Sequence, residues 1–332
     1  MGEFKDTPSK VVIRKTWCKP LLRFINENLN YKLIYLGLPG PQALDLLEWI
    51  EYIDQVVAFQ CRYYPKPSSI EQDNACVLDL EEKLRTLERE GKLSTYSLYD
   101  GWIEEVLLRG RDTNGDSFSQ NDVVTVYNLD FCNEITKPLK IQDDDGNIHQ
   151  FYKSEAIRRL LEIQRDVSSK VRSKKFIMFL TVHSHFWAEE AKNFIDRTES
   201  QPIMDYIETV NGLKRSSKCI RLLKAYVFDT VKTYFCNYDF TPEFLPVIYY
   251  KGAGRKMKHM LLLFTIIGAE NKQVSGAPCF QKTKDYLKYK FITIENGTFC
   301  HWENGINGEI DSSLNSIKAF CDTDCFKNVW SK

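Results

Sequence analysis

The segment KLIYLGLPGPQALDLLEWI (residues 32–50) decides the fold, because it joins an apolar strand to a helix through a short glycine-rich turn. Apolar residues fill Lys32–Leu36, which is typical of a buried strand. The turn Gly37–Pro41 holds two glycines and two prolines, and Gln42–Ile53 continues with apolar residues at helical spacing. Another apolar run, Gln55–Phe59, follows at once. The segment therefore predicts a strand–turn–helix unit at the front of a sheet, with a second strand directly behind it.

Seven such apolar runs recur along the chain, and segments too long for hairpins separate most of the first six. The runs are Lys32–Leu36, Gln55–Phe59, Ser94–Tyr99, Asp122–Leu129, Lys175–Val182, Leu245–Lys251 and Met260–Gly268. About eight residues, Gly252–His259, lie between the last two, which is a hairpin spacing. Strands that alternate with helices predict a parallel sheet covered on both faces. The expected fold is α/β, with a seven-stranded, mostly parallel sheet and an antiparallel terminal hairpin.

The composition is that of an ordinary globular protein. The chain has 332 residues, of which 43% are hydrophobic and 27% charged, and its formal net charge is zero. No run approaches the roughly 18 apolar residues of a membrane span, and Met1–Lys10 lacks the apolar core of a secretory signal. We therefore expect a cytoplasmic protein without a membrane partner, in which the ten cysteines are free thiols or metal ligands rather than disulfides.

The chain is expected to divide near residue 270. Residues 1–269 would form the α/β domain, which begins with an amphipathic helix over Val11–Leu29 that Pro20 kinks or breaks. A helical insertion is expected at about residues 184–240. Residues 270–332 differ in character, because they carry four cysteines and a small hairpin signal, and we interpret them as a C-terminal appendage.

Ligands of open α/β sheets bind beyond the carboxyl ends of the strands, so these ends hold the candidate site residues. Gly37 and Gly40 lack the Cβ that would keep a ligand from the backbone, whereas Pro39 has no N–H to donate. The turn fits either a ligand-binding loop or a plain tight turn. The sequence contains neither GxGxxG nor GxxxxGK[ST], which removes the main support for dinucleotide binding and for a P-loop NTPase.

The most apolar strand ends in the polar sequence Asn128-Leu129-Asp130-Phe131. Asp130 accepts hydrogen bonds from an amine or hydroxyl, Asn128 both donates and accepts, and Phe131 offers a ring for stacking on a planar base. The structural alternative is an Asx-type turn followed by a phenylalanine of the core.

This succession of elements, over roughly Lys32–Ala269, resembles the class I S-adenosylmethionine-dependent methyltransferases, which have a Rossmann-like fold. The resemblance implies that the first turn holds the methionine part of the cofactor, the second strand end the ribose and the third the adenine. The implied cofactor-binding residues are Gly37, Pro39, Gly40, Gln60, Asp100 and Gly101. The implied catalytic residues are Asn128, Asp130 and Phe131, in the place of the Asn/Asp-Pro-Pro-Tyr/Phe motif of the amino-methylating members.

The chain also departs from the family pattern at three places. Gln60 replaces the usual acidic residue, Tyr35 stands where an acidic residue precedes the first glycine, and the two prolines after Asn128 are absent. Two functions therefore stay open. One is methyl transfer, with a nucleobase amine of nucleic acid as a candidate acceptor. The alternative is a catalytically inactive methyltransferase-like scaffold that binds a protein or nucleic-acid partner. No nucleophile–base pair supports a third option, hydrolysis or group transfer on a nucleotide.

Four further patterns carry candidate sites. Cys279, Cys300, Cys321 and Cys325 could hold zinc, although no CxxC pair is present and unligated thiols are the plainer interpretation. The hairpin tip supplies Lys251, Arg255, Lys256 and Lys258 for contact with nucleic-acid phosphates, or forms a solvated turn. His183 and His185 end the fifth strand and could bind a metal or act as a general base, although no carboxylate cluster is visible nearby in the sequence to complete such a site. The run from Asp112 to Asp116 imitates a calcium loop but has Ser117 in place of its glycine and Val123 in place of its glutamate.

Overall fold

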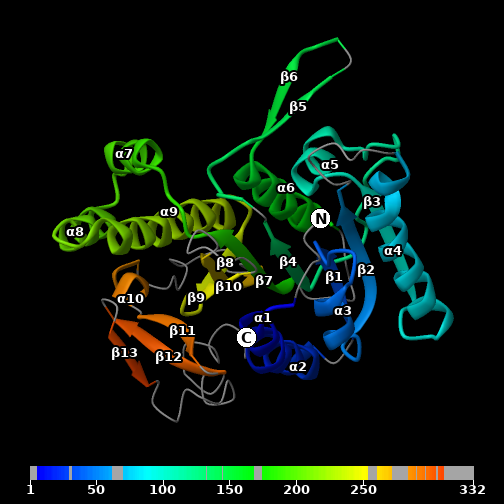
Figure 1. Cartoon of the computed structure of the whole chain (residues 1–332), viewed down its shortest axis with the longest axis horizontal. Helices are drawn as coiled ribbons and strands as arrows, with labels where there is room; N and C mark the ends of the chain where they lie inside the picture. Colours follow the sequence, from blue (N-terminus) through cyan, green and yellow to red (C-terminus); the bar gives the residue numbers. More distant parts are fainter. Residues whose placement is uncertain are drawn as a thin grey trace. The chain divides into compact units, whose positions relative to one another are not determined.

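The computed structural model describes residues 6–29, 32–61, 70–131, 133–143, 145–167, 174–252, 260–270, 283–288, 290–295, 297–303 and 306–309 (Figure 1). The chain folds into two compact units. We call Arg14–Asp130 with Lys137–Met178 the parallel-sheet unit. The remaining segments, Met1–Ile13, Phe131–Thr136 and Phe179–Lys332, form the mixed-sheet unit.

Among the described residues of the parallel-sheet unit, four parallel strands lie in the order β3-β2-β1-β4, and the unit also contains Lys175–Met178. They are β1 (Leu33–Gly37), β2 (Ile53–Gln60), β3 (Thr95–Asp100) and β4 (Val126–Asp130). All five residues of β1 are buried, as its apolar sequence predicts. Because β2 lies on one side of β1 and β4 on the other, the strand order reverses between β1 and β4. This reversal is the position at which open α/β sheets bind ligands.

The described helices of this unit precede or connect its strands. They are α2 (Lys19–Leu29), α3 (Leu44–Trp49), α4 (Ile70–Arg89), α5 (Ile103–Arg109) and α6 (Lys153–Asp166). Helix α6 buries an apolar stripe that includes Ala156, Leu160 and Leu161. The hairpin of β5 (Leu139–Gln142) and β6 (Ile148–Phe151) forms its own two-stranded sheet.

The predicted first helix is divided into three helical segments. It consists of α1 (Pro8–Val12), the π-helix η1 (Ile13–Cys18) and α2, which begins one residue before Pro20. Proline fits near a helix start, because its missing N–H leaves no bond unmade there. The irregularity expected at Pro20 is thus the widened π segment that precedes it.

Strand β4 begins at Val126 instead of the predicted Asp122. The side chain of Gln164 on α6 provides the reason. Its Oε1 accepts from the N–H of Val124 at 3.1 Å, and its Nε2 donates to the carbonyl oxygen of Val124 at 2.8 Å. Both backbone groups of Val124 are therefore satisfied by a side chain, without pairing to another strand.

The mixed-sheet unit contains the last residues of β7 (Lys175–His183) and six further strands. These are β8 (Phe240–Phe244), β9 (Ile248–Lys251), β10 (Met260–Glu270), β11 (Phe291–Glu295), β12 (Thr298–Glu303) and β13 (Ile306–Glu309). Strand β10 runs antiparallel to β9, so the predicted terminal hairpin is confirmed. Besides α1, the described helices of the mixed-sheet unit are α7 (Ala188–Arg197), α8 (Gln201–Val210), α9 (Arg215–Asn237) and α10 (Thr283–Lys288). Helices α7, α8 and α9 lie in the region of the expected insertion.

The predicted α/β class is therefore confirmed, while the predicted seven strands are too few. Strand β8 escaped the sequence pattern because Pro242 and Glu243 interrupt its apolar residues. It pairs with β10 all the same, with Pro242 opposite Gly268. Beyond residue 270, β11 pairs in parallel with β9, so the described strands of the expected appendage extend the same sheet.

Candidate functional site at the strand ends

The parallel strands bring the predicted site residues to one edge of their sheet. Gly37 at the end of β1 lies opposite Asn128 of β4 and Ala58 of β2. Two residues beyond Ala58, Gln60 lies opposite Asp100 of β3. Because all four strands are parallel, these ends belong to one edge, which holds a glycine turn, two amides and a carboxylate.

The turn after β1 depends on Gly37 for a reason inside the protein. A Cβ built on Gly37 would lie 2.3 Å from the carbonyl oxygen of Asn128, which also accepts the N–H of Leu38 at 2.9 Å. Gly40 differs, because it has a φ of 67° and open space where a Cβ would stand. The backbone at Gly40 is therefore the part of the turn that a ligand can approach closely.

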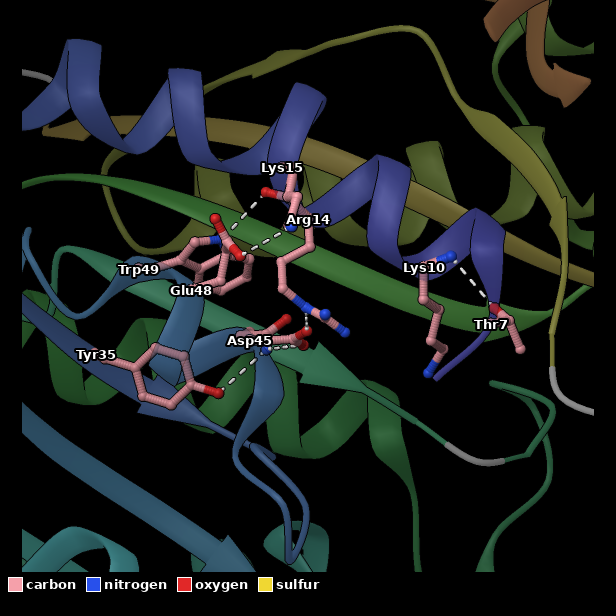
Figure 2. Close-up of polar contacts among 9 residues, drawn as sticks. Thr7, Lys10, Arg14, Lys15, Tyr35, Asp45, Glu48 and Trp49 are labelled. Atoms are coloured by element: carbon pink, nitrogen blue, oxygen red, sulfur yellow. Dashed lines mark hydrogen bonds and ion pairs between the residues drawn. The ribbon is translucent and has the colours of Figure 1, made fainter. Parts of the chain in front are cut away.

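A polar cluster lies where the strand order reverses, and we call Arg14, Tyr35, Asp45 and Asn128 the switch-point cluster. Figure 2 labels Arg14, Tyr35 and Asp45 of this cluster. The side-chain nitrogen of Asn128 donates to the Tyr35 hydroxyl and to Asp45 Oδ2, at 3.1 Å in each case. Arg14 Nε forms an ion pair with Asp45 Oδ1 at 2.6 Å. The side chain of Arg14 is 7% exposed and that of Asp45 is 27% exposed, so Asp45 is the more accessible charge of the pair.

The cluster draws one residue from each of four elements, η1, β1, α3 and β4. Asp45 belongs to the first turn of α3, whose preceding residue Ala43 adopts a left-handed conformation with a φ of 49°. Arg14 lies in η1, and its carbonyl oxygen accepts the indole N–H of Trp49 from the end of α3 at 3.2 Å. The π-helix and α3 are thereby joined through both the backbone and the side chain of Arg14.

Burial shapes the electrostatics of the cluster. It raises the pKa of Tyr35 well above its ordinary value, and the negative charges of Asp45 and Asp130 raise it further, while the hydrogen bond from Asn128 lowers it. Burial also raises the pKa of Cys18, with Asp45 adding to the rise and Arg14 opposing it. Both side chains are therefore neutral at physiological pH, and the Tyr35 hydroxyl keeps its proton.

The end of β3 is closed by the loop that follows α5. Thr113 donates both its N–H and its hydroxyl to the carbonyl oxygen of Asp100, each at 2.8 Å. Asp112 Oδ2 accepts the N–H of Asp100 at 3.1 Å, and Oδ1 accepts the N–H groups of Asn114 and Asp116 at 2.9 Å. The calcium-like run is thus an Asx-type turn, whose carboxylate oxygens bind backbone N–H groups.

The other predicted residues of this edge differ in how accessible they are. The amide nitrogen of Gln60 donates to the carbonyl oxygen of Cys61 at 3.0 Å, which leaves its amide oxygen as an acceptor. A Cβ on Gly101 would lie 3.1 Å from Val106 Cγ2, so the approach to Gly101 is narrow. Pro39 lies in the loop between β1 and α3, and Asp130 is half-buried at the end of β4. Phe131 is buried, and its N–H donates to the carbonyl oxygen of Thr181 at 3.1 Å.

Sequence reasoning missed Arg14 and Asp45. Asp45 carried a usable signal, because it is an acidic residue in the first turn of a helix that directly follows a glycine-rich turn. Arg14 carried none beyond its place in a basic helix, since its partner lies 31 residues away in sequence.

The zinc and phosphate predictions fall largely outside the described residues. This applies to Cys279, Cys321 and Cys325 and to Arg255, Lys256 and Lys258. Of the remaining residues in these groups, Cys300 is buried in β12 and Lys251 is exposed at the end of β9. Within the part of the chain that the structure describes, no group of three or more His, Cys, Asp or Glu side chains is placed to hold a metal ion. None of the helices in that part has the length and apolar character of a membrane span.

Comparison with known proteins gives weak structural likenesses. No family model matches the chain, and no curated protein matches it. EvdMO1 is 10% identical with a TM-score of 0.34, and the match covers 76% of this chain and 40% of EvdMO1. TYW2 of P. horikoshii in complex with MeSAdo is 10% identical with a TM-score of 0.37, covering 81% and 66%. An O-methyltransferase from Bacillus cereus in complex with SAH is 10% identical with a TM-score of 0.35, covering 81% and 84%. At these TM-scores the likenesses assign no family, and function must follow from the chain's own geometry.

Proposed function

We propose that this chain binds S-adenosylmethionine at the carboxyl edge of β3-β2-β1-β4 and transfers the methyl group to an amine. One observation carries the proposal. The reversal of strand order between β1 and β4 coincides with a built cluster of one guanidinium, one carboxylate, one amide and one neutral phenol. Open α/β sheets place their ligands at this topological position, so the cluster has a location suited to binding as well as the groups for it.

The switch-point cluster fits the amino-acid end of the cofactor. A methionine moiety carries an ammonium, and the cluster offers it the Asp45 carboxylate, which the Arg14 guanidinium holds in place. Asp45 is the accessible member and is suited to the ammonium. The open backbone at Gly40 leaves room beside the cluster that a side chain would fill.

The next strand ends fit the nucleoside part less completely. The free amide oxygen of Gln60 is an acceptor suited to a ribose hydroxyl, although it is a weaker acceptor than a carboxylate. The Asp100 side chain is 4% exposed, and the Asp112 turn binds both backbone groups of Asp100. The turn of residues 112–116 would therefore lie against an adenine bound at this end.

The chemistry required of the chain itself is modest. When bound, S-adenosylmethionine supplies an already activated methyl group, so the protein has to align the acceptor and accept one proton. Asp130 is suited to the proton, because it is a half-buried carboxylate at the end of β4. We propose a nucleobase amine as the acceptor, since Lys251 and the basic residues after it in the sequence are suited to nucleic-acid phosphates.

One observation favours the alternative, a scaffold without catalysis. Asn128 is 5% exposed, and both hydrogens of its side-chain nitrogen are donated inside the switch-point cluster. A residue bound in this way stabilises the strand ends and has no N–H left for a methyl acceptor. The scaffold function would retain the cluster as a structural element and use other surfaces for its partner.

Titration calorimetry of the full chain with S-adenosylmethionine tests the proposal. We expect saturable binding, and we expect Asp45→Asn to weaken it at least about tenfold, because hydrogen bonds to charged groups contribute roughly 1.5–3 kcal/mol. The matched control is Glu51→Gln, which changes a carboxylate that is 55% exposed and paired with Lys19, and it should bind like the wild type. Asp130→Ala should bind the cofactor and lose transfer of a labelled methyl group to short RNA and DNA.

The absence of binding up to millimolar cofactor would contradict the proposal and leave the scaffold function. Equal affinities for wild type and Asp45→Asn would mean that the cofactor does not bind at the switch-point cluster. Thermal melting of each variant separates these results from loss of folding.

A further inference from the structure

An exposed aromatic surface lies beyond the end of β7 in the mixed-sheet unit. Trp187 is 51% exposed, although tryptophan is highly buried in most proteins. The other large apolar side chains that are exposed in the described residues are Leu47, Leu78, Ile148 and Tyr152. Trp187 offers the largest flat ring of this group.

The backbone holds this ring in place. His185 and Trp187 are exposed while Phe186 between them is 2% exposed, which is the alternation of an extended segment. Phe186 packs against Tyr226 of α9 with ring centroids 5.4 Å apart, and Tyr226 also contacts Phe194 of α7. The buried ring of Phe186 therefore anchors the segment, and the rings of His185 and Trp187 are on its solvent-exposed side.

The two exposed rings support each other. The His185 and Trp187 centroids are 4.3 Å apart, at an interplanar angle of 61°. An edge-to-face contact of this kind fixes the orientation of the indole without covering it. The result is a pre-ordered aromatic surface, which loses little side-chain entropy when another ring stacks on it.

A cation lies at the same end of the sheet. The N–H of Ser184 donates to the carbonyl oxygen of Met260 at 2.9 Å, and Met260 lies opposite Lys251 in the β9–β10 pair. Lys251 is exposed. The exposed indole follows the end of β7 and Lys251 ends β9, so both lie at the same end of the sheet in the mixed-sheet unit.

We propose that Trp187, supported by His185, is the stacking platform for a base of single-stranded nucleic acid, with Lys251 contacting one phosphate. This inference rests on the proposed function and names its substrate class. Aromatic side chains beside a basic strand end are the usual means of binding single strands, because every base has a face that stacks on a ring.

The charges near Trp187 indicate that this surface does not bind through phosphate contacts alone. Glu189 and Glu190 lie in the first turn of α7, which directly follows Trp187, and their carboxylates repel phosphate. The affinity should therefore come mainly from stacking, with a shallow salt dependence of about one phosphate. A site that reads the backbone alone would show a steep dependence on salt concentration.

Fluorescence anisotropy with labelled twelve-residue oligomers tests the platform in the full-length protein. The probes are oligoadenylate, oligodeoxyadenylate and an abasic oligomer of the same length and charge. We expect both base-bearing oligomers to bind at least about tenfold more tightly than the abasic one, since stacking contributes a factor of that order per base. Trp187→Ala should lose at least about tenfold in affinity, Trp187→Phe should retain most of it, and Lys251→Gln should reduce the salt slope by about 0.7.

Tyr152→Ala is the matched control, because Tyr152 is another exposed aromatic residue, 40% exposed, and lies outside the proposed platform. It should bind like the wild type. Equal affinities for Trp187→Ala and wild type, or equal binding of abasic and base-bearing oligomers, would overturn the inference, as would the absence of binding by the wild type. Calorimetry of Trp187→Ala with S-adenosylmethionine keeps the two proposals apart, because cofactor binding should be unchanged by this substitution.

Discussion

At the scale of single residues, two glycines in the same turn have different physical reasons. Gly37 is required because the carbonyl oxygen of Asn128 occupies the space of a Cβ, at 2.3 Å. Gly40 is favoured because its φ of 67° is left-handed, while the space around it is open. The sequence pattern alone marks both as ligand-loop glycines and does not distinguish them.

Substitution of each glycine by alanine should separate these reasons. Gly37→Ala forces β1 and β4 apart and should destabilise the protein by about 3 kcal/mol or more, at or above the upper range for overpacking. Gly40→Ala should cost about 1–2 kcal/mol, the penalty of a left-handed conformation with a Cβ. Urea unfolding followed by circular dichroism measures both values. Equal costs would contradict the close approach between Gly37 and Asn128.

The candidate site shows how far residue-level prediction reaches. Gly37, Gln60, Asp100 and Asn128 could be found because strand ends are visible in the sequence and parallel strands end together. The Arg14–Asp45 pair could not be found, because it depends on how a π-helix packs against α3. Side-chain pairing between distant helices leaves no local pattern in a sequence.

At the scale of elements, runs with a pure pattern were predictable and interrupted ones were not. Strands β1, β2, β3 and β7 lie within two residues of their predicted bounds, because each contains consecutive or alternating apolar residues and ends at a polar or glycine position. Strand β8 contains Pro242, and its pairing with β10 is a tertiary effect. The late start of β4 has the same kind of cause, since a glutamine on α6 binds the backbone before it.

The Asp112 turn is an element whose stability one side chain controls. Its carboxylate accepts three backbone N–H groups, and the residue is 7% exposed. Asp112→Ala leaves these donors without their acceptor and should cost about 2–4 kcal/mol, because hydrogen bonds to charged groups are among the stronger ones. Amide hydrogen exchange at Asp100 and Asn114 should accelerate as well.

The control for this prediction is Asp122→Ala, which changes an exposed aspartate just before the apolar run that leads into β4. Its unfolding free energy should stay within about 0.5 kcal/mol of the wild type, as for most surface substitutions. If Asp112→Ala behaves like Asp122→Ala, the turn does not depend on the carboxylate.

At the scale of the whole molecule, charge balance leaves the pH dependence of stability to particular buried groups. The chain has 45 basic and 45 acidic residues, so its formal net charge at pH 7 is zero and overall repulsion is small. Lys224 on α9 is the clearest such group in the mixed-sheet unit. It is 1% exposed, and its Nζ donates to the carbonyl oxygens of Tyr286 and Leu287 near the end of α10, at 3.0 and 3.3 Å.

Burial, together with a smaller effect from the charge of Arg221, lowers the pKa of Lys224 from 10.5 to about 7. Between these two pH values the unfolded chain binds a proton that the folded chain does not, so this group makes stability rise with pH from about 7 to about 10. Below pH 7 the folded chain carries the buried charge, and that stability is lost.

We expect the unfolding free energy of the wild type minus that of Lys224→Met to increase from pH 6.5 through pH 8 to pH 9.5, measured by urea unfolding. Because both proteins share all other titratable groups, subtracting the variant's unfolding free energy at each pH cancels their contributions. A constant difference would mean that the two carbonyl oxygens and the ring of Tyr286, 4.7 Å from Nζ, keep the ammonium charged in the folded protein.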